Sequence, residues 1–242
     1  MKKKKVLIIS LCAAAAVILA AVIIWIVIAN AELEGPAPVL TVEEAYRPKL
    51  DEFYAVIADP NSAEVLYDGL SAVHRAALEF GDEALDKIGY EFQDVNNDGW
   101  EELFIGCFGD EDTASASNDI YAAFSYNGQD VKPIFEKQKR NTFALTDTGS
   151  FYFYGSDGVA YHILAEYELN ETGEMICKDF YFSYPVYGDI NNLEYFHNTT
   201  GQWDPENSEK IEMTFDELEA MRKELAEKTV AIDAEKFSEI VK

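Results

Sequence analysis

The sequence is poor in basic residues and histidines, and each shortage removes a class of function. Four of the 19 Lys and Arg are the lysines of the MKKKK start. The segment from Glu32 onward therefore has 15 Lys and Arg against all 45 Asp and Glu, and its net charge is −30. Such a charge repels nucleic acid and anionic lipid, so we expect no nucleic-acid partner. The three histidines, His74, His162 and His197, are far apart and lack the spacing of zinc ligands.

Sequence motifs for catalysis are missing as well. The chain has no Gly-x-Ser-x-Gly nucleophile turn and no glycine loop of the kind that binds phosphate. We therefore favour a protein that binds over one that catalyses, without settling whether it is an enzyme. The alternative is a surface carbohydrate hydrolase that uses an Asp/Glu pair, and the sequence gives no means of choosing that pair among 45 acidic residues.

Cysteines are too few for a disulfide-rich scaffold. Only Cys107 and Cys177 lie beyond residue 31. In an oxidising compartment they could pair, and closing a loop of about 70 residues would stabilise the fold by roughly 4 kcal/mol. Cys107 shares a predicted strand face with Leu103 and Ile105, however, so a buried free thiol is the simpler interpretation.

The first 30 residues differ from the rest. The MKKKK start precedes an uncharged apolar run over residues 6–28, which as a helix would be about 35 Å long and would cross a hydrocarbon core of about 30 Å. The lysines should stay in the cytoplasm. We predict a cytoplasmic stub and single-pass transmembrane anchor over 1–30, a linker over 31–40, and an extracytoplasmic domain over 41–242 in the cell membrane.

Cleavage of this segment is the alternative. Ala29-Asn30-Ala31 has the small-x-small pattern of a signal-peptidase site, so the domain would be secreted after cleavage following Ala31. An apolar core this long exceeds the roughly 7–15 residues of a cleaved signal, which favours a retained anchor.

Capping residues and apolar spacing predict four helices beyond the linker. Thr41 with Glu44, and Thr214 with Glu217, form capping boxes at two helix starts. Pro48 predicts a kink or a restart within the first helix. The first two helices should form a hairpin and the last two should close the chain. The predicted helices are 42–58, 62–80, 215–228 and 234–241.

Between these helices the apolar period changes to two, which indicates strands separated by short glycine turns. Close spacing favours an antiparallel meander, so the fold class is α+β. Residues 192–209 are predicted to be irregular. The predicted strands are 88–92, 100–108, 119–126, 142–146, 150–154, 159–169 and 174–184.

Aromatic residues crowd the strands. In 151–154, Phe151 and Phe153 share one face, which is typical of a sheet packed on a core. The segment 180–184 has the same pattern, with Phe180 and Phe182 on one face. The tyrosines of the opposite face, Tyr152 and Tyr154 among them, offer as an alternative a platform on which a sugar or peptide could stack.

The stretch DVNNDGWEELFIG, residues 94–106, has oxygen-bearing side chains at alternate positions before a glycine. A hard cation such as Ca²⁺ takes six to eight oxygen ligands, and a tight loop supplies them from positions 1, 3 and 5, a backbone carbonyl at position 7 and a side chain at position 9. We predict a calcium site in loop 94–102. Its ligands would be Asp94, Asn96, Asp98, the carbonyl of Trp100, and Glu102.

This loop does not fit an EF-hand. Position 12, which carries a bidentate Glu in that motif, is Ile105, and both flanks look like strands. The ion would therefore staple two strands as a structural cofactor, with the millimolar to sub-millimolar affinity of extracellular modules. A metal-free turn rich in Asn, Asp and Gly is the alternative.

A family resemblance accompanies this loop. The segment GYEFQDVNNDGWEELFIG, residues 89–106, resembles the calcium loop of FG-GAP or VCBS-type repeats, and more closely a segment that recurs in exported bacterial proteins without an assigned function. The resemblance implies calcium binding by Asp94, Asn96, Asp98 and Glu102, and it implies no activity. FG-GAP propellers need several copies and this chain has one, so it does not imply a propeller.

These expectations combine into one functional hypothesis. The chain would be an acidic, membrane-anchored and calcium-stabilised domain at the surface of a bacterial cell, acting as a binding or interaction module. Its contact with the membrane would run through residues 6–28. A surface glycan or a protein would be its partner, and the sequence does not choose between them.

Overall fold

The computed structural model describes residues 40–63, 68–108, 118–138 and 140–240. The predicted stub and membrane anchor over 1–30, the alternative cleavage after Ala31, and the linker up to residue 39 lie outside these residues. Within the described ranges, no helix is long and apolar enough to cross a membrane.

The first described helix, α2 (Val42–Ala58), has the predicted bounds. Its capping box is formed: Thr41 Oγ1 accepts from the N–H of Glu44 at 3.2 Å, and Glu44 Oε2 accepts from the N–H of Thr41 at 2.9 Å. The helix continues through Pro48, so the restart considered for that position does not occur.

Helix α3 (Asp68–Phe80) packs against α2, as a helical hairpin requires. The sequence predicts that this helix begins at residue 62, but residues 62 and 63 are not helical, and residues 64–67 lie outside the described ranges. A 3₁₀ turn, η1 (Gly81–Glu83), and the single turn α4 (Ala84–Lys87) then lead into the first strand.

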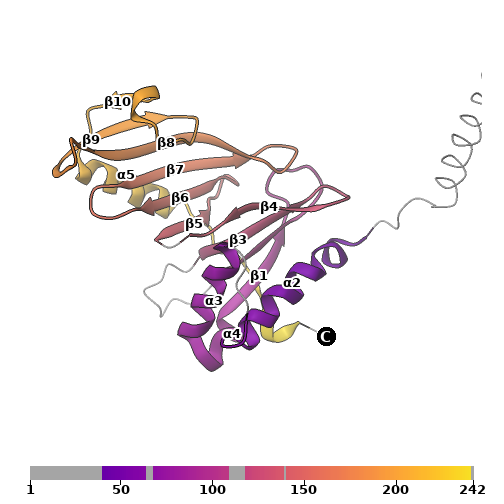
Figure 1. Cartoon of the computed structure of the whole chain (residues 1–242). Coiled ribbons are helices and arrows are strands. Elements are labelled where there is room, and N and C mark those ends of the chain that lie inside the picture. The colour runs from indigo at the N-terminus through magenta and orange to yellow at the C-terminus, as the bar shows by residue number, and fades with distance from the viewer. Residues whose placement is uncertain (1–39, 64–67, 109–117, 139, 241–242) are drawn as a thin grey trace, which may run out of the picture. The chain divides into compact units, whose positions relative to one another are not determined.

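The strands form two antiparallel sheets, where the sequence predicted one meander (Figure 1). The first sheet has the order β11-β1-β2-β3-β4 and the second β10-β9-β8-β7-β6-β5. Strands of the first sheet are β1 (Ile88–Gln93), β2 (Glu102–Phe108), β3 (Asn118–Tyr126), β4 (Val131–Glu136) and β11 (Glu235–Lys236). Those of the second are β5 (Asn141–Leu145), β6 (Phe151–Ser156), β7 (His162–Leu169), β8 (Met175–Val186), β9 (Asp189–Asn198) and β10 (Glu209–Ile211).

The structure contains strands that the sequence does not predict, β4 and β9 among them. Strand β4 was missed, and it tolerates Pro133 because it is an edge strand with a neighbour on one side only. Strand β9 occupies residues predicted to be irregular, where its pairing with β8 and β10 outweighs weak local alternation. The chain then forms a 3₁₀ turn, η2 (Pro205–Asn207), before β10.

The C-terminus contains a further correction. Helix α5 (Phe215–Glu227) begins at the predicted capping box. The helix predicted over 234–241 is wrong, because β11 and a 3₁₀ turn, η3 (Phe237–Glu239), replace it. Tertiary contacts explain the difference: β11 pairs with Gly89 and Tyr90 of β1, and Phe237 is fully buried against the Tyr90 ring, 5.3 Å between centroids.

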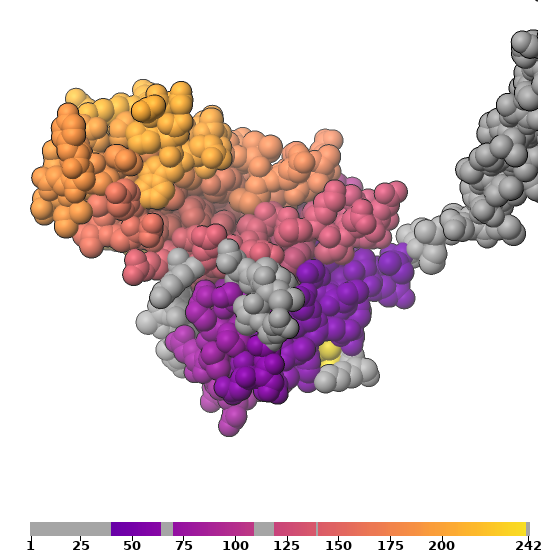
Figure 2. Space-filling view, viewed as in Figure 1, coloured from indigo at the N-terminus to yellow at the C-terminus, as the bar shows by residue number. Residues whose placement is uncertain are grey.

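The elements stack in four layers: helices, first sheet, second sheet and α5 (Figure 1). Alternation along β2 shows why. Leu103 and Ile105 are buried in a core shared with α2 and α3. Phe104 faces the second sheet instead, and its ring packs on that of Phe151, with 5.8 Å between the ring centroids. In the space-filling view the indigo and purple helices lie on the opposite side of the pink strands from the orange part of the chain, whereas the yellow C-terminal end lies beside the helices (Figure 2).

The buried cores also decide two alternatives. Cys107 belongs to the core beside the helices and Cys177 packs on the core between the sheets, so the two thiols lie on different sides of the first sheet and form no disulfide. Tyr152 is 4% exposed and packs in a third core with Leu218 of α5. The proposed tyrosine platform on β6 is therefore wrong at Tyr152, because α5 covers that face.

Candidate metal centre

The predicted calcium loop connects β1 to β2 in the first sheet, between the paired residues Gln93 and Glu102. Two of its residues have left-handed backbones, Asn97 with φ +59° and Gly99 with φ +91°. Asn and Gly adopt this conformation at least cost, so the local sequence fits a tight reversal. The loop therefore folds back on itself within a few residues.

Asx side chains organise the loop from inside. The N–H of Gly99 donates to Oδ2 of Asp94 at 3.0 Å, and the N–H of Trp100 donates to Oδ1 of Asp98 at 2.8 Å. The N–H of Asp98 donates to Oδ1 of Asn96 at 3.1 Å. Three of the predicted ligands thus turn their oxygens toward the loop's own backbone.

Glu102 is the most buried of the predicted ligands. It is 0% exposed, and its Oε2 accepts from the N–H of Val95 at 3.0 Å. Its other oxygen, Oε1, and Oδ1 of Asp94 are shielded from solvent and have no hydrogen-bond partner among the described residues. A buried acceptor without a partner loses its hydration without compensation, which costs about 1–3 kcal/mol or more for a charged group.

The burial of Glu102 also shifts its pKa. The pKa of its carboxyl is raised from 4.5 to about 7, chiefly by burial and also by the nearby charges of Asp98 and Asp94, against the lowering effect of the Val95 hydrogen bond. The loop thus holds a carboxyl group with no compensating positive charge. A cation bound at these carboxylates would reverse the effect and favour the ionised form.

The loop has the ligand types that a hard cation prefers, but its side chains are not arranged around a closed metal site. Oxygen donors are the ligands that Ca²⁺ prefers, and two of them have no partner. Yet Asn96 Nδ2 donates to Asp98 Oδ2 at 3.1 Å, and within the described ranges no three His, Cys, Asp or Glu side chains form a group able to hold a metal ion. Closing the loop around an ion would require Asp98 to exchange the Asn96 contact for the metal.

The structure adds a residue that the sequence did not predict. Asn96 Nδ2 also donates to the carbonyl of Asn170, at 2.9 Å. Asn170 begins the turn between β7 and β8, where its Oδ1 accepts from the N–H groups of Thr172 and Glu174 at 3.0 and 2.9 Å. The loop of the first sheet is therefore tied to a turn of the second sheet. The sequence signals the turn through Thr172-Gly173 but not what it contacts.

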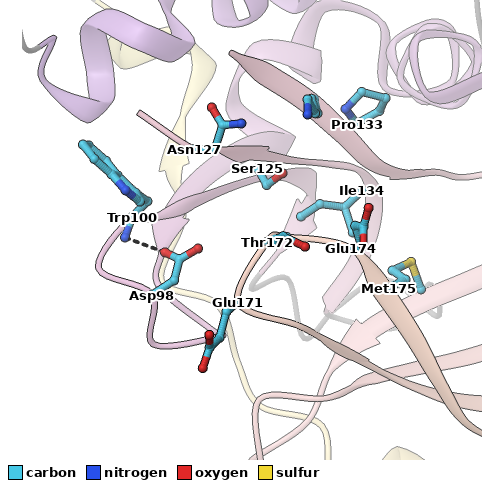
Figure 3. A pocket seen from close by; sticks show the side chains of 12 residues that line it. Asp98, Trp100, Ser125, Asn127, Pro133, Ile134, Glu171, Thr172, Glu174 and Met175 are labelled. Carbon is cyan, nitrogen blue, oxygen red and sulfur yellow. Dashed lines mark hydrogen bonds between the residues drawn. The ribbon is translucent and has the colours of Figure 1, made fainter. Parts of the chain in front are cut away.

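A cavity of about 630 Å³ borders the loop. Its walls come from Asp98 and Trp100 of the loop, from the β3–β4 hairpin, and from residues 171–175 of the β7–β8 turn. Figure 3 shows Asp98, Ser125, Ile134 and Thr172 arranged around this space. Any change in loop conformation is thus also a change in one wall of the cavity.

Comparisons with known proteins assign no family. No protein-family profile, no curated protein and no solved structure matches the chain. Functional inference therefore depends on the residues of the loop and the cavity.

Proposed function

We propose that this chain is a calcium-stabilised binding domain, held at the outer face of a bacterial cell membrane, that acts without catalysis. One observation supports it above the others. Oδ1 of Asp94 and Oε1 of Glu102 have no partner among the described residues, although both are shielded from solvent in a loop with the sequence Asp-x-Asn-x-Asp-Gly. A bound cation would supply the missing partner.

In this proposal the loop holds Ca²⁺ through its side-chain oxygens and one carbonyl. The ion would supply positive charge, and the ligands would remain those of the sequence prediction. Binding would fix the connection between β1 and β2, and through Asn96 it would also fix the turn at Asn170. The ligands would be Asp94, Asn96, Asp98, the carbonyl of Trp100, and Glu102.

The cellular location is the less direct part of the proposal. It depends on the uncharged run over 6–28 after four lysines and on a net charge of −30 beyond it. Calcium at millimolar concentration outside a cell would fill a weak site that stays empty inside. The finer architecture, an N-terminal transmembrane helix before the α+β domain, belongs to this proposal, as does the resemblance to exported bacterial proteins.

Thermal unfolding of the full chain in mild detergent tests the calcium site. Because a ligand that binds only the folded state stabilises it by mass action, calcium at 100 times its dissociation constant should add about 2.7 kcal/mol relative to chelator. Asp98→Ala should abolish the shift. Asp157→Ala is the matched control, since Asp157 also precedes a left-handed glycine, Gly158 with φ +94°.

Two results would count against the proposal. An equal calcium shift in wild type and Asp98→Ala would place the ion elsewhere. Release of reducing sugar from oligosaccharides incubated with the chain would overturn the non-catalytic part and favour the carbohydrate hydrolase.

A further inference from the structure

The cavity beside the loop has the size of a small-molecule site. Its volume of about 630 Å³ lies within the roughly 300–1,000 Å³ of ligand pockets. It also has a tightly packed floor. Gly173 is buried with φ +74°, and a Cβ at that position would lie 2.6 Å from Ser125 Oγ. The β7–β8 turn and strand β3 therefore meet closely under the cavity.

Hydrogen-bonding groups line the cavity, and several remain available. The side chains of Ser125, Lys132 and Glu171 have no hydrogen-bond or ion-pair partner among the described residues. Asn127 accepts two backbone N–H groups with its Oδ1, from Gln129 at 3.1 Å and Asp130 at 2.9 Å, which leaves its amide N–H₂ to donate. The walls thus offer both donors and acceptors.

Apolar surface lies between these polar groups. Pro133 and Ile134 of β4 and Met175 of β8 contribute to the same walls (Figure 3). Alternating apolar and hydrogen-bonding surface matches a sugar ring, whose C–H faces are apolar and whose hydroxyl groups both donate and accept. Charge excludes one class of ligand: three carboxylates, of Asp98, Glu171 and Glu174, outnumber the amine of Lys132, so an anion is repelled. A hydroxyl-rich ligand without negative charge can pair with both the donors and the acceptors of the walls.

The loop contributes to this site directly. Asp98 is both a proposed calcium ligand and a wall residue, and Trp100 packs on the β3–β4 hairpin, with its ring 5.1 Å from that of Tyr126. The hydrogen bond from Asn96 to Asn170 ties the loop to the β7–β8 turn, which forms the opposite wall. An ion that orders the loop would therefore order two of the three walls.

We propose that this cavity binds a sugar unit of an uncharged glycan, and that calcium in loop 94–102 strengthens the binding. The proposal rests on the calcium site proposed above and names the ligand class of the binding domain. Since coupling between two sites is reciprocal, the glycan must raise calcium affinity by the same factor.

Calorimetry on the full chain in detergent tests this, with uncharged trisaccharides of glucose, mannose or N-acetylglucosamine as probes. At least one should bind in millimolar calcium and bind about fivefold or more weakly in chelator, the lower end of ordinary allosteric coupling. Thr172→Val and Ser125→Ala should each weaken binding severalfold while leaving the calcium-dependent thermal shift intact.

Thr200→Val is the matched control. Thr200 donates to Oδ1 of Asn198 at 3.0 Å, as Thr172 does to Oδ1 of Asn170 at 2.8 Å, but it lies in a different turn. Its trisaccharide affinity should equal that of wild type. Equal weakening by Thr200→Val and Thr172→Val would overturn the assignment to the cavity.

The outcomes separate the two proposals. The glycan inference is overturned, and the calcium site is not, if calcium shifts the unfolding temperature but no trisaccharide binds. The same holds if a trisaccharide binds and calcium does not affect its binding, or if a lysine-rich peptide binds in place of sugar. Absence of any calcium shift in wild type overturns both.

Discussion

Replacing Glu102 by glutamine should change how the stability of the calcium-free chain depends on pH. The Glu102 side chain is 0% exposed, and its pKa is raised from 4.5 to about 7 by burial and then by the charges of Asp98 and Asp94. A carboxyl with a raised pKa stabilises the fold when protonated. That contribution is complete below the unfolded value of 4.5 and is lost as pH rises through about 7.

The magnitude follows from the same values. Each pKa unit corresponds to about 1.4 kcal/mol, so moving the Glu102 pKa from 4.5 to about 7 corresponds to about 3 kcal/mol. Glutamine has no such titration. In chelator, the free energy of unfolding of Glu102→Gln relative to wild type should therefore rise by about 3 kcal/mol between about pH 4 and about pH 8.

Urea unfolding of the full chain in detergent and chelator, followed by tryptophan fluorescence at several pH values, measures this difference. Titrating groups far from Glu102 contribute equally to both proteins and cancel. Glu101→Gln, which removes an exposed neighbouring carboxylate, is the control and should run parallel to wild type. Calcium should restore wild type at high pH and stabilise Glu102→Gln much less. Parallel pH curves for wild type and Glu102→Gln in chelator would refute the reasoning.

Two further predictions concern packing. Phe237→Ala should destabilise the chain by about 3–5 kcal/mol, because it empties a fully buried site against Tyr90, and urea unfolding would show it; a change below about 1 kcal/mol would contradict the C-terminal docking. Gly173→Ala should lower the free energy of unfolding by about 1–3 kcal/mol, because its Cβ would lie 2.6 Å from Ser125 Oγ and its backbone is left-handed. The double variant with Ser125→Gly should recover part of that loss.

Local signals in the sequence predicted local structure well. Helix α2 has the predicted bounds because its start is specified by two residues, Thr41 and Glu44, three positions apart. The failures occur where distant residues decide. Residues 234–241 have helical composition, yet β11 forms there because Gly89 admits a close strand: a Cβ at Gly89 would lie 2.8 Å from the Glu235 carbonyl.

The candidate site divides along the same line. The loop was predictable because Asp94, Asn96 and Asp98 act on N–H groups no more than five residues away. The cavity was not, because it needs the β7–β8 turn, which lies in the other sheet. Asn96 and Asn170 are 74 positions apart, and nothing in either segment marks the other as its partner.

The position of the loop decides what a bound ion could do for the fold. An ion that held only β1 to β2 would add little, because these strands are already paired along the whole length of β1, from Ile88 with Cys107 to Gln93 with Glu102. The Asn96 to Asn170 hydrogen bond makes the loop also a contact between the two sheets, at the edge of their shared core. Calcium should therefore stabilise the packing of one sheet on the other, and its effect should appear in the global unfolding transition of the domain as a whole.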